Sequence, residues 1–349
     1  MAKTLGVCGY VSSGSSAVID LLKEFDNMQA LDQIEFLFPY FPDGLEDLEC
    51  KVTNCRKYFS STVAINRFRQ LMKWNYLNKP TNEKTFQISE EFLKKIIQVS
   101  WRGRSMVDEL IVSRGKAFII KITKKMTRGL RLKKHPKFIE GLMLYNIETA
   151  ISSDDFDAQA KDFISNILSE MGRDQNKITV LDQPFEGCDP VKSFKYFDDP
   201  KAVVVNRDPR DQYLFNKIFL RKRGIYHTPC DNVDDYIKYY KLIRKSPPDL
   251  RERNDVLYMN FEELVYDYDN AVSKVAHFCG AGEHTNKGKF FKPTHSASNT
   301  QLFRKFTGYE EDIAKIEAEL PEYLFDFDKY PEVQPEGGMF WGSQGRKRK

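Results

Sequence analysis

The sequence predicts an α/β protein of three layers, with a central parallel sheet flanked by helices. Short apolar runs alternate with segments whose apolar residues recur every three or four positions, which is typical of alternating strands and helices. The run from Ala202 to Val205 is rich in valine and too short for a helix, so we expect a fully buried central strand there. The first run, from Leu5 to Cys8, leads into a turn of glycines and serines and then into a helix pattern.

The turn at residues 9–16 predicts an anion site. Free N–H groups at a helix N-terminus and the helix dipole favour negative charge, and Gly9 and Gly14 permit positive φ or a close backbone approach. The spacing G-x-x-x-x-G-S-S resembles the ATP-type phosphate loop, but Ser15 stands where that loop has its lysine. We therefore expect a phosphate group other than the γ-phosphate of a kinase. A βα turn without a ligand is the alternative.

Three charged residues are expected where later strands end, the edge at which open parallel sheets bind ligands. Arg207 follows the central strand, and a guanidinium there is costly unless it meets an anion. The alternative is a structural ion pair, either Arg207 with Asp211 or Asp208 with Arg210. Glu35 is a single carboxylate inside the apolar run at residues 28–38, which is expected to form a short strand and its exit, and its alternative is a strand-end side chain that faces solvent. Asp182 ends a strand expected at residues 177–184, and a further strand is expected at residues 256–261.

The chain is predicted to form one α/β domain over residues 1–330, followed by a loose basic tail at 331–349. Within the domain, residues of about 42–175 are predicted to be a mainly helical insertion on the acceptor side. The segment Lys121–Lys137 is rich in Lys and Arg and holds no Asp or Glu. It is either a solvated face or a basic rim for an anionic ligand.

Composition excludes several classes of protein. The 349 residues include 54 basic and 50 acidic side chains, a net charge of +4 that argues against a dedicated nucleic-acid binder. No stretch of 18 uncharged apolar residues and no signal-peptide pattern is found, so we expect no transmembrane segment and a cytoplasmic protein. The 6 cysteines form no C-x-x-C pair and the 5 histidines show no H-x-x-x-H spacing. No metal site is therefore expected.

Four segments, in this order, resemble landmarks of the sulfotransferases that use 3′-phosphoadenosine-5′-phosphosulfate. Val11–Ser16 is similar to their 5′-phosphosulfate loop, P-[KR]-S-G-T-[TS], and Val203–Asp211 to their 3′-phosphate element. Leu257–Gly280 and Ser298–Thr307 are similar to a later strand with its helix and to the C-terminal cofactor loop. The resemblance implies a P-loop-like fold and metal-independent, in-line transfer of a sulfuryl group from that nucleotide. The partner would be a small hydroxyl acceptor, which is a carbohydrate, a sterol-like alcohol or a lipid.

The resemblance also implies which residues hold the nucleotide: Ser12, Ser13, Gly14, Ser15, Ser16, Arg207, Asn216, Arg304 and Lys305. The departures from the family pattern include Ser12 and Phe215. Ser12 replaces the basic residue of the loop, so Arg304, Lys305 or a residue of Lys121–Lys137 would have to supply that charge. Phe215 stands where the family has a serine that contacts the 3′-phosphate, with Asn216 beside it.

Two carboxylates could accept the proton of the acceptor hydroxyl. Glu35 resembles the glutamate that ends the second strand of carbohydrate sulfotransferases, and it is preferred. Asp182 lies two residues before Pro184, where cytosolic members of the family have histidine. Two other classes stay open: a P-loop-type kinase that lacks the usual lysine, and a non-catalytic protein that binds a nucleotide or a sulfated glycan.

Overall fold

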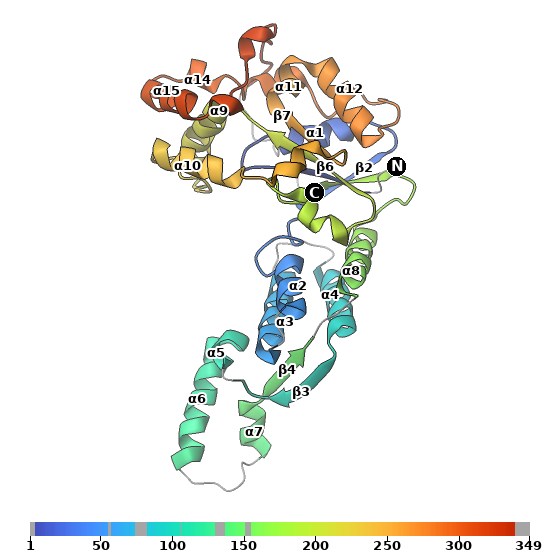
Figure 1. The fold of residues 1–349 in the computed structure, drawn as a ribbon, viewed down its shortest axis with the longest axis vertical. Helices are drawn as coiled ribbons and strands as arrows, with labels where there is room; N and C mark the ends of the chain where they lie inside the picture. The colour runs from blue at the N-terminus through green and yellow to red at the C-terminus, as the bar shows by residue number, and fades with distance from the viewer. Residues whose placement is uncertain are drawn as a thin grey trace. The chain divides into compact units, whose positions relative to one another are not determined.

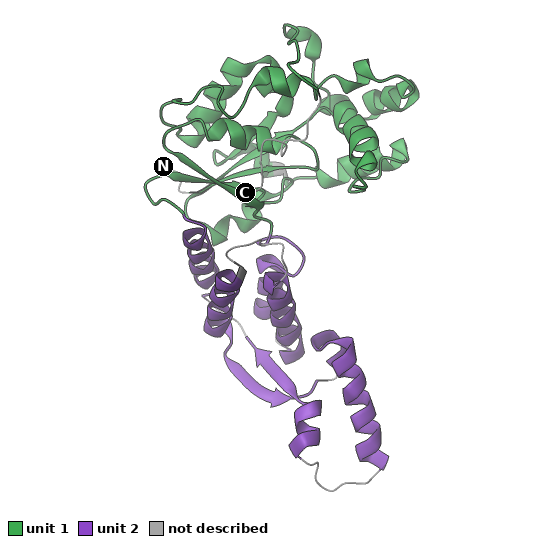
Figure 2. Ribbon diagram, turned by 180° about the vertical axis from the view of Figure 1, so that it is seen from behind, with its two compact units in different colours: residues 1–37, 173–349 green, residues 38–172 purple. Residues whose placement is uncertain are grey.

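The computed structural model describes residues 4–54, 57–73, 82–105, 107–129, 137–150 and 155–338. The chain divides into two compact units (Figure 2). The sheet unit consists of residues 1–37 and 173–349, and the inserted unit of residues 38–172 lies between these two segments in the sequence. The predicted tail lies only partly within the described residues, since its basic end, Arg346–Lys349, falls outside them.

A five-stranded parallel sheet forms the centre of the sheet unit, with the strand order β2-β5-β1-β6-β7 (Figure 1). Every neighbouring pair is non-consecutive in sequence except β6 and β7, so the chain crosses over the sheet repeatedly. The predicted α/β class with a central parallel sheet is confirmed. The strands are β1 (Thr4–Gly9), β2 (Met28–Glu35), β5 (Ile178–Asp182), β6 (Pro200–Asn206) and β7 (Val256–Asn260).

Helices α1 (Ser15–Leu22), α11 (Phe261–Tyr266) and α12 (Tyr268–Cys279) contribute to the core on one face of the sheet (Figure 1). Alternate strand residues such as Val203 and Val205 pack into this core, as the two-residue period of a strand requires. On β1, Gly6 lies against the ring of Phe185. A Cβ at Gly6 would come within 2.4 Å of that ring, so glycine is needed there.

A second apolar cluster is formed by other helices of the sheet unit. Its buried residues include Tyr213, Leu214, Tyr236 and Ile316. Its members come from elements between β6 and the C-terminal region. These elements, with the shorter ones around them, are η2 (Pro190–Tyr196), α9 (Pro209–Leu214), η3 (Phe215–Leu220), α10 (Val233–Ile243), η4 (Pro248–Glu252), α13 (Pro293–Ala297), α14 (Leu302–Lys305), α15 (Glu310–Glu319), η5 (Pro321–Tyr323) and η6 (Phe327–Lys329).

The inserted unit is mainly helical but also contains a two-stranded antiparallel sheet, in which Trp101 pairs with Ile147. Phe68, Phe92 and Phe163 form its aromatic core, with ring centroids 4.9–5.9 Å apart. Its elements are α2 (Leu45–Thr53), α3 (Tyr58–Lys73), α4 (Asn82–Ile96), β3 (Val99–Gly103), α5 (Asp108–Ile111), α6 (Arg114–Gly129), α7 (Lys137–Met143), β4 (Tyr145–Thr149) and α8 (Phe156–Glu170).

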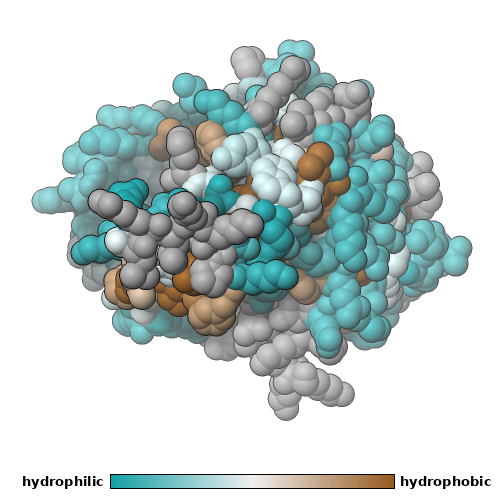
Figure 3. Space-filling model, turned by 90° about the horizontal axis from the view of Figure 1, so that it is seen from below, coloured by the Kyte–Doolittle hydropathy of each residue, from teal (hydrophilic) through white to brown (hydrophobic). Residues whose placement is uncertain are grey.

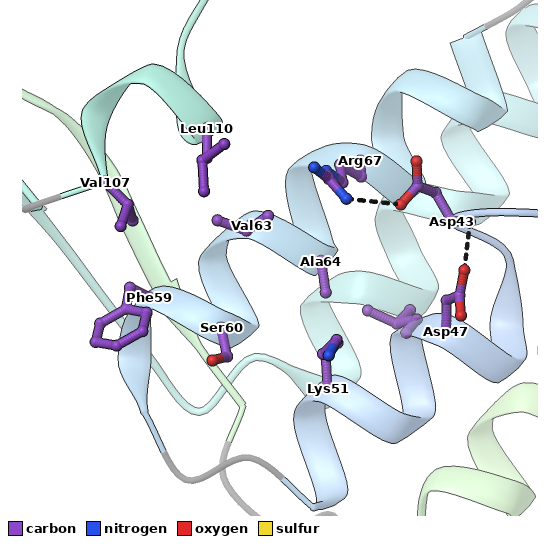
Figure 4. Close-up of a pocket in the computed structure, with 11 residues that line it drawn as sticks. Asp43, Asp47, Lys51, Phe59, Ser60, Val63, Ala64, Arg67, Val107 and Leu110 are labelled. Carbon is purple, nitrogen blue, oxygen red and sulfur yellow. Dashed lines mark hydrogen bonds and ion pairs between the residues drawn. The ribbon is translucent and has the colours of Figure 1, made fainter.

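The inserted unit contains a pocket of about 430 Å³ (Figure 4). Phe59, Val63 and Leu110 give it an apolar wall. On another side Asp43 faces Arg67, with 3.5 Å between the carboxylate oxygen and the guanidinium nitrogen. Among the residues that the structure describes, no helix has both the length and the apolar character that crossing a membrane requires.

Candidate functional site

The loop between β1 and α1 is held in one shape by Ser13. Its N–H donates to the carbonyl of Tyr10 at 2.9 Å, and its Oγ accepts from the N–H of Tyr10 at 3.0 Å. Ser12 and Gly14 take left-handed backbone conformations, with φ of 63° and 89°. A Cβ at Gly14 would lie 2.5 Å from the ring of Phe261, so this position needs glycine for space as well as for conformation.

The N-terminus of α1 is open toward this loop. Its N-cap is Gly14, and no side chain caps the helix. The N–H groups of the first turn have no acceptor within the helix, so those of Ser15 and Ser16 are available to an anion. The structure thus has the strand, loop and helix N-terminus that the sequence predicts.

Gln183 connects the two ends of the loop and was not among the predicted site residues. Its side-chain oxygen accepts from the N–H of Gly9 at 3.1 Å, and its Nε2 donates to Oγ of Ser15 at 2.9 Å. Gln183 follows directly after β5, with a φ of 53°. The signal that could have found it is its position at a strand end, next to Asp182.

Replacing Gln183 by alanine is expected to destabilise the sheet unit by about 1–3 kcal/mol, because a part-buried N–H and a hydroxyl lose their partner. Urea unfolding at neutral pH measures the change. Gln33→Ala is a matched control, since Gln33 is exposed on β2. Equal losses in the two variants would contradict the assigned role of Gln183.

Arg207 lies against the loop. It follows β6 and is only 4% exposed. Its Nη1 donates to the carbonyl of Ser12 at 2.9 Å and its Nη2 to the carbonyl of Asn299 at 2.5 Å. The guanidinium carbon is 4.9 Å from the ring centre of Phe215. The Nε–H is buried and has no hydrogen-bond partner among the described residues.

The carboxylates near Arg207 have other partners. Asp211 accepts the backbone N–H groups of Gln301 and Leu302, both at 2.6 Å. Asp208 forms an ion pair with Arg210 at 2.7 Å, which is one of the two alternatives that the sequence left open. The guanidinium of Arg207 therefore donates to backbone carbonyls. The carboxylate of Asp211 instead accepts from the backbone at residues 301 and 302, and that of Asp208 pairs with Arg210.

Glu262, like Asp208 and Asp211, has no exposed surface. One of its oxygens accepts from the N–H of Asp208 at 3.0 Å, and the other has no partner among the described residues. Burial, with the charges of Asp208 and Asp211, raises the pKa of Glu262 to about 8. Burial also raises the pKa of Asp211. The pKa of Glu262 lies above neutral pH, which favours a neutral side chain at this acid and one negative charge fewer near Arg207.

The raised pKa of Glu262 predicts a pH dependence of stability. In the folded chain the carboxyl keeps its proton up to pH about 8, whereas in the unfolded chain it ionises above its ordinary pKa of 4.5. Because the folded state binds more protons over this interval, the free energy of unfolding falls as the pH rises from about 4.5 to 8. Glu262→Gln keeps the acceptor oxygen and removes the titration.

Urea unfolding of wild type and Glu262→Gln at pH 5, 7 and 9 tests this dependence. We expect the free energy of unfolding of Glu262→Gln, relative to that of wild type, to rise by about 2–4 kcal/mol between pH 5 and pH 9. Glu252→Gln, at an exposed carboxylate, controls for a general change of charge. A difference that stays constant with pH would contradict the buried, protonated state of Glu262.

Arg244 is a second buried guanidinium near the loop and was also missed. It is sandwiched between the rings of Tyr10 and Tyr240, with its guanidinium carbon 3.9 and 3.5 Å from their centres. Its Nη2 donates to the side-chain oxygen of Gln212 at 3.0 Å, and the amide of Gln212 donates to the carbonyl of Val11. Its Nε and Nη1 have no partner among the described residues. No local pattern marks Arg244, which follows the end of α10.

The other residues that were predicted to bind the nucleotide fall into two groups, one at the loop and one away from it. Asn216 is buried and its side-chain oxygen accepts from the hydroxyl of Ser12 at 3.3 Å, so it lies at the loop. Arg304 instead pairs with Asp328 at 2.8 Å. The ammonium of Lys305 donates to carbonyls of its own segment at 2.7 and 3.2 Å, and burial lowers its pKa. Among the described contacts, neither Arg304 nor Lys305 touches the loop.

The two candidate bases lie at the same edge of the sheet. The pairing of β2 with β5 is regular up to Leu31, which faces Leu181, and then shifts so that Glu35 faces Asp182. The side chain of Glu35 is exposed, whereas Asp182 is 6% exposed. Asp182 immediately precedes Gln183, which contacts the loop. Asp182 therefore stands on β5, the neighbour of β1, and Glu35 stands on β2, one strand further from the loop.

Two other predictions concern parts outside this site. The described part of Lys121–Lys137 belongs to the inserted unit, and its residues 130–136 lie outside the described residues. Among the residues that the structure describes, no group of three or more His, Cys, Asp or Glu side chains is arranged to hold a metal ion.

Comparison with known proteins gives structural matches alone. No family model and no curated protein matches the sequence. The sulfotransferase domain of the Synechococcus PCC 7002 olefin synthase matches with a TM-score of 0.42 and 13% identity, over 93% of this chain and 96% of that one. Retinol dehydratase, solved with androsterone and the inactive cofactor PAP, matches with a TM-score of 0.35 and 13% identity, over 93% and 82% of the two chains. Sulfotransferase STF9 from Mycobacterium avium matches with a TM-score of 0.37 and 11% identity, over 96% of this chain and 79% of that one.

Proposed function

We propose that the chain is a sulfotransferase whose co-substrate is 3′-phosphoadenosine-5′-phosphosulfate. The observation that carries the proposal is the position of Arg207: a buried guanidinium with an unpartnered Nε–H, bonded to the backbone of the serine loop. A buried guanidinium without a full set of partners is costly, and a phosphate oxygen would satisfy it. The open N-terminus of α1 provides a separate set of donors on the same loop.

This arrangement suits a ligand that has two anionic groups. We assign the 5′-phosphosulfate to the loop from Ser12 to Ser16, where Asn216 contacts Ser12, and the 3′-phosphate to Arg207. Ser12 leaves the loop without its own cation. Arg207 is assigned to the 3′-phosphate, and Arg244 is connected to the loop through Gln212, so we assign the compensating charge to Arg244. Arg304 and Lys305 remain proposed contacts of the C-terminal segment with the nucleotide.

The nucleotide supplies a sulfuryl group that is transferred to a hydroxyl of the acceptor. The chain supplies the groups that bind it and a carboxylate that takes the hydroxyl proton. Glu35 is the preferred base, and its exposed side chain can pass the proton on to water. Asp182 is the second candidate. The proposed acceptor is a carbohydrate, a sterol-like alcohol or a lipid, bound on the side of the carboxyl ends of β2 and β5.

Calorimetry with 3′,5′-adenosine bisphosphate, the product form of the nucleotide, tests the binding step. We expect saturable binding by the full chain, and weaker binding of ATP with or without Mg²⁺. Tighter binding of ATP, together with Mg²⁺-dependent turnover, would contradict the proposal and support a kinase. A screen of alcohols with sulfur-labelled donor then tests the transfer. Binding of the bisphosphate without transfer to any alcohol would support a non-catalytic nucleotide-binding protein.

A further inference from the structure

Helix α6 in the inserted unit has a buried face that fixes its rotation about its own axis. Ile120 is 2% exposed and belongs to an apolar cluster with Ile111 and Ile147. Thr123 and Thr127 are 8% exposed, and each hydroxyl donates to a carbonyl of the same helix, at 2.7 and 3.1 Å. Because these residues face inward, the side chains on the other faces of α6 must point away from the cluster.

A second face of α6 carries large apolar side chains that reach the surface. Phe118, Ile122 and Met126 follow one another at a spacing of four residues, so they form one row along the helix. They are 63, 43 and 59% exposed, and Ile119 beside them is 44% exposed. Phe138, on the neighbouring α7, is 77% exposed. We call Phe118, Ile122 and Met126 the apolar row of α6.

Apolar side chains this exposed and this close together are unusual on a soluble protein and mark interaction surfaces. Figure 3 shows one face of the molecule, on which hydrophobic side chains reach the surface among hydrophilic ones.

A third face of α6 is basic. Lys121, Lys125 and Arg128 are exposed, and none of them has a carboxylate within 4 Å among the described residues. Lys124 is 3.8 Å from Asp108. Helix α6 itself contains no acidic residue. The helix therefore presents an apolar row next to a row of unpaired cations.

We propose that α6 docks on the surface of an anionic lipid bilayer, with its apolar row in the acyl boundary and Lys121, Lys125 and Arg128 among the headgroups. A helix with one apolar and one basic face, free of acidic residues, fits the plane of such a surface. Its 16 residues are interrupted by cations throughout, so it lies on the membrane and does not span it.

Charge and apolarity together favour lipid over other partners. A nucleic acid would use the cations and leave the apolar row in water. A second copy of the chain would cover the apolar rows but bring two sets of unpaired cations together. An anionic bilayer satisfies both faces at once.

Co-sedimentation of the full chain with lipid vesicles tests the proposal. We expect binding to vesicles of phosphatidylcholine mixed with phosphatidylserine, weaker binding to phosphatidylcholine alone, and a loss of binding as salt increases. Replacing Lys121, Lys125 and Arg128 by glutamine should weaken partition onto the mixed vesicles by about 100-fold, since each surface cation contributes about fivefold. Replacing Phe118, Ile122 and Met126 by serine should weaken it by at least about tenfold.

Matched controls remove equivalent side chains elsewhere. Leu242→Ser deletes an apolar side chain that is 71% exposed on α10. Replacing Lys94, Lys222 and Lys238 by glutamine removes three exposed cations. Both controls should bind vesicles like wild type, and thermal unfolding confirms that every variant is folded.

Three results would overturn the proposal. The first is binding to mixed vesicles that neither α6 variant reduces. The second is no vesicle binding, together with a dimer in size-exclusion chromatography that the serine variant dissociates, which would assign the row to a second copy. The third is no vesicle binding, together with binding to duplex DNA that only the glutamine variant loses. None of these measurements involves the nucleotide or an acceptor, so the outcome is independent of the proposed sulfotransferase activity.

Discussion

Replacing Arg207 by alanine is expected to weaken the binding of 3′,5′-adenosine bisphosphate by about 100- to 1000-fold, which corresponds to about 3–4 kcal/mol. Arg207 is the buried cation that bonds directly to the backbone of the serine loop, through the carbonyl of Ser12. A guanidinium forms charge-assisted, bidentate contacts with phosphate, and the removal of a desolvated pair of this kind has a large effect on affinity. Isothermal titration calorimetry of wild type and variant measures the loss.

The same side chain also holds the carbonyls of Ser12 and Asn299, so the alanine variant loses structure as well as charge. Arg207→Lys separates the two effects, because it keeps the charge but not the planar fork. We expect it to bind about tenfold more weakly than wild type. Arg253→Ala removes an exposed arginine that pairs with Asp255, and it should bind normally. Equal affinities of wild type and both Arg207 variants would disprove the assignment of the 3′-phosphate.

Replacing Glu35 by glutamine is expected to slow sulfuryl transfer by about 100- to 10,000-fold while the affinity for the bisphosphate stays unchanged. The amide keeps the size of the side chain but cannot take a proton. Asp182→Asn is the competing variant, and the one that slows transfer more identifies the base. Initial rates with labelled donor under saturating nucleotide measure both.

The two carboxylates differ in ways that help to separate their roles. Asp182 is buried and lies beside Gln183, so Asp182→Asn should also alter stability, whereas the exposed Glu35 should not. Glu252→Gln, at another exposed carboxylate of the sheet unit, serves as the control for charge alone. If neither Glu35→Gln nor Asp182→Asn slows transfer, both assignments are wrong and the proton goes elsewhere.

The sequence predicted the sheet well because its signals are local. Apolar runs such as Ala202–Val205 and Leu5–Cys8 are strand-forming whatever surrounds them, and parallel strands place their carboxyl ends at one edge. That geometry brings Arg207 to the serine loop although the two are almost 200 residues apart in the chain. The two-stranded sheet of β3 and β4, in contrast, lies inside a region expected to be mainly helical. Its antiparallel register, in which Trp101 lies opposite Ile147, pairs segments more than 40 residues apart in the chain.

The supporting residues of the site could not be predicted because their roles depend on tertiary contacts. Gln183 forms hydrogen bonds to both ends of a loop that lies about 170 residues earlier in the chain. Arg244 is connected to that loop through Gln212. The protonation of Glu262 follows from complete burial, which no local pattern reveals for a residue next to a helix start. The preference for Glu35 over Asp182 likewise rested on resemblance, and the shifted pairing at the end of β2 was not foreseen.

The order of the strands sets the order in which this protein can fold during synthesis. The central strand β1 emerges first, yet its partners are β5 and β6, whose paired residues begin at Thr179 and Pro200. At a synthesis rate of about 5–20 residues per second, β1 waits on the order of ten seconds or more for a neighbour. The inserted unit is one continuous segment, residues 38–172, and is complete by then. We therefore expect it to reach its native contacts first, while the sheet closes late and slowly because its contacts span long stretches of chain.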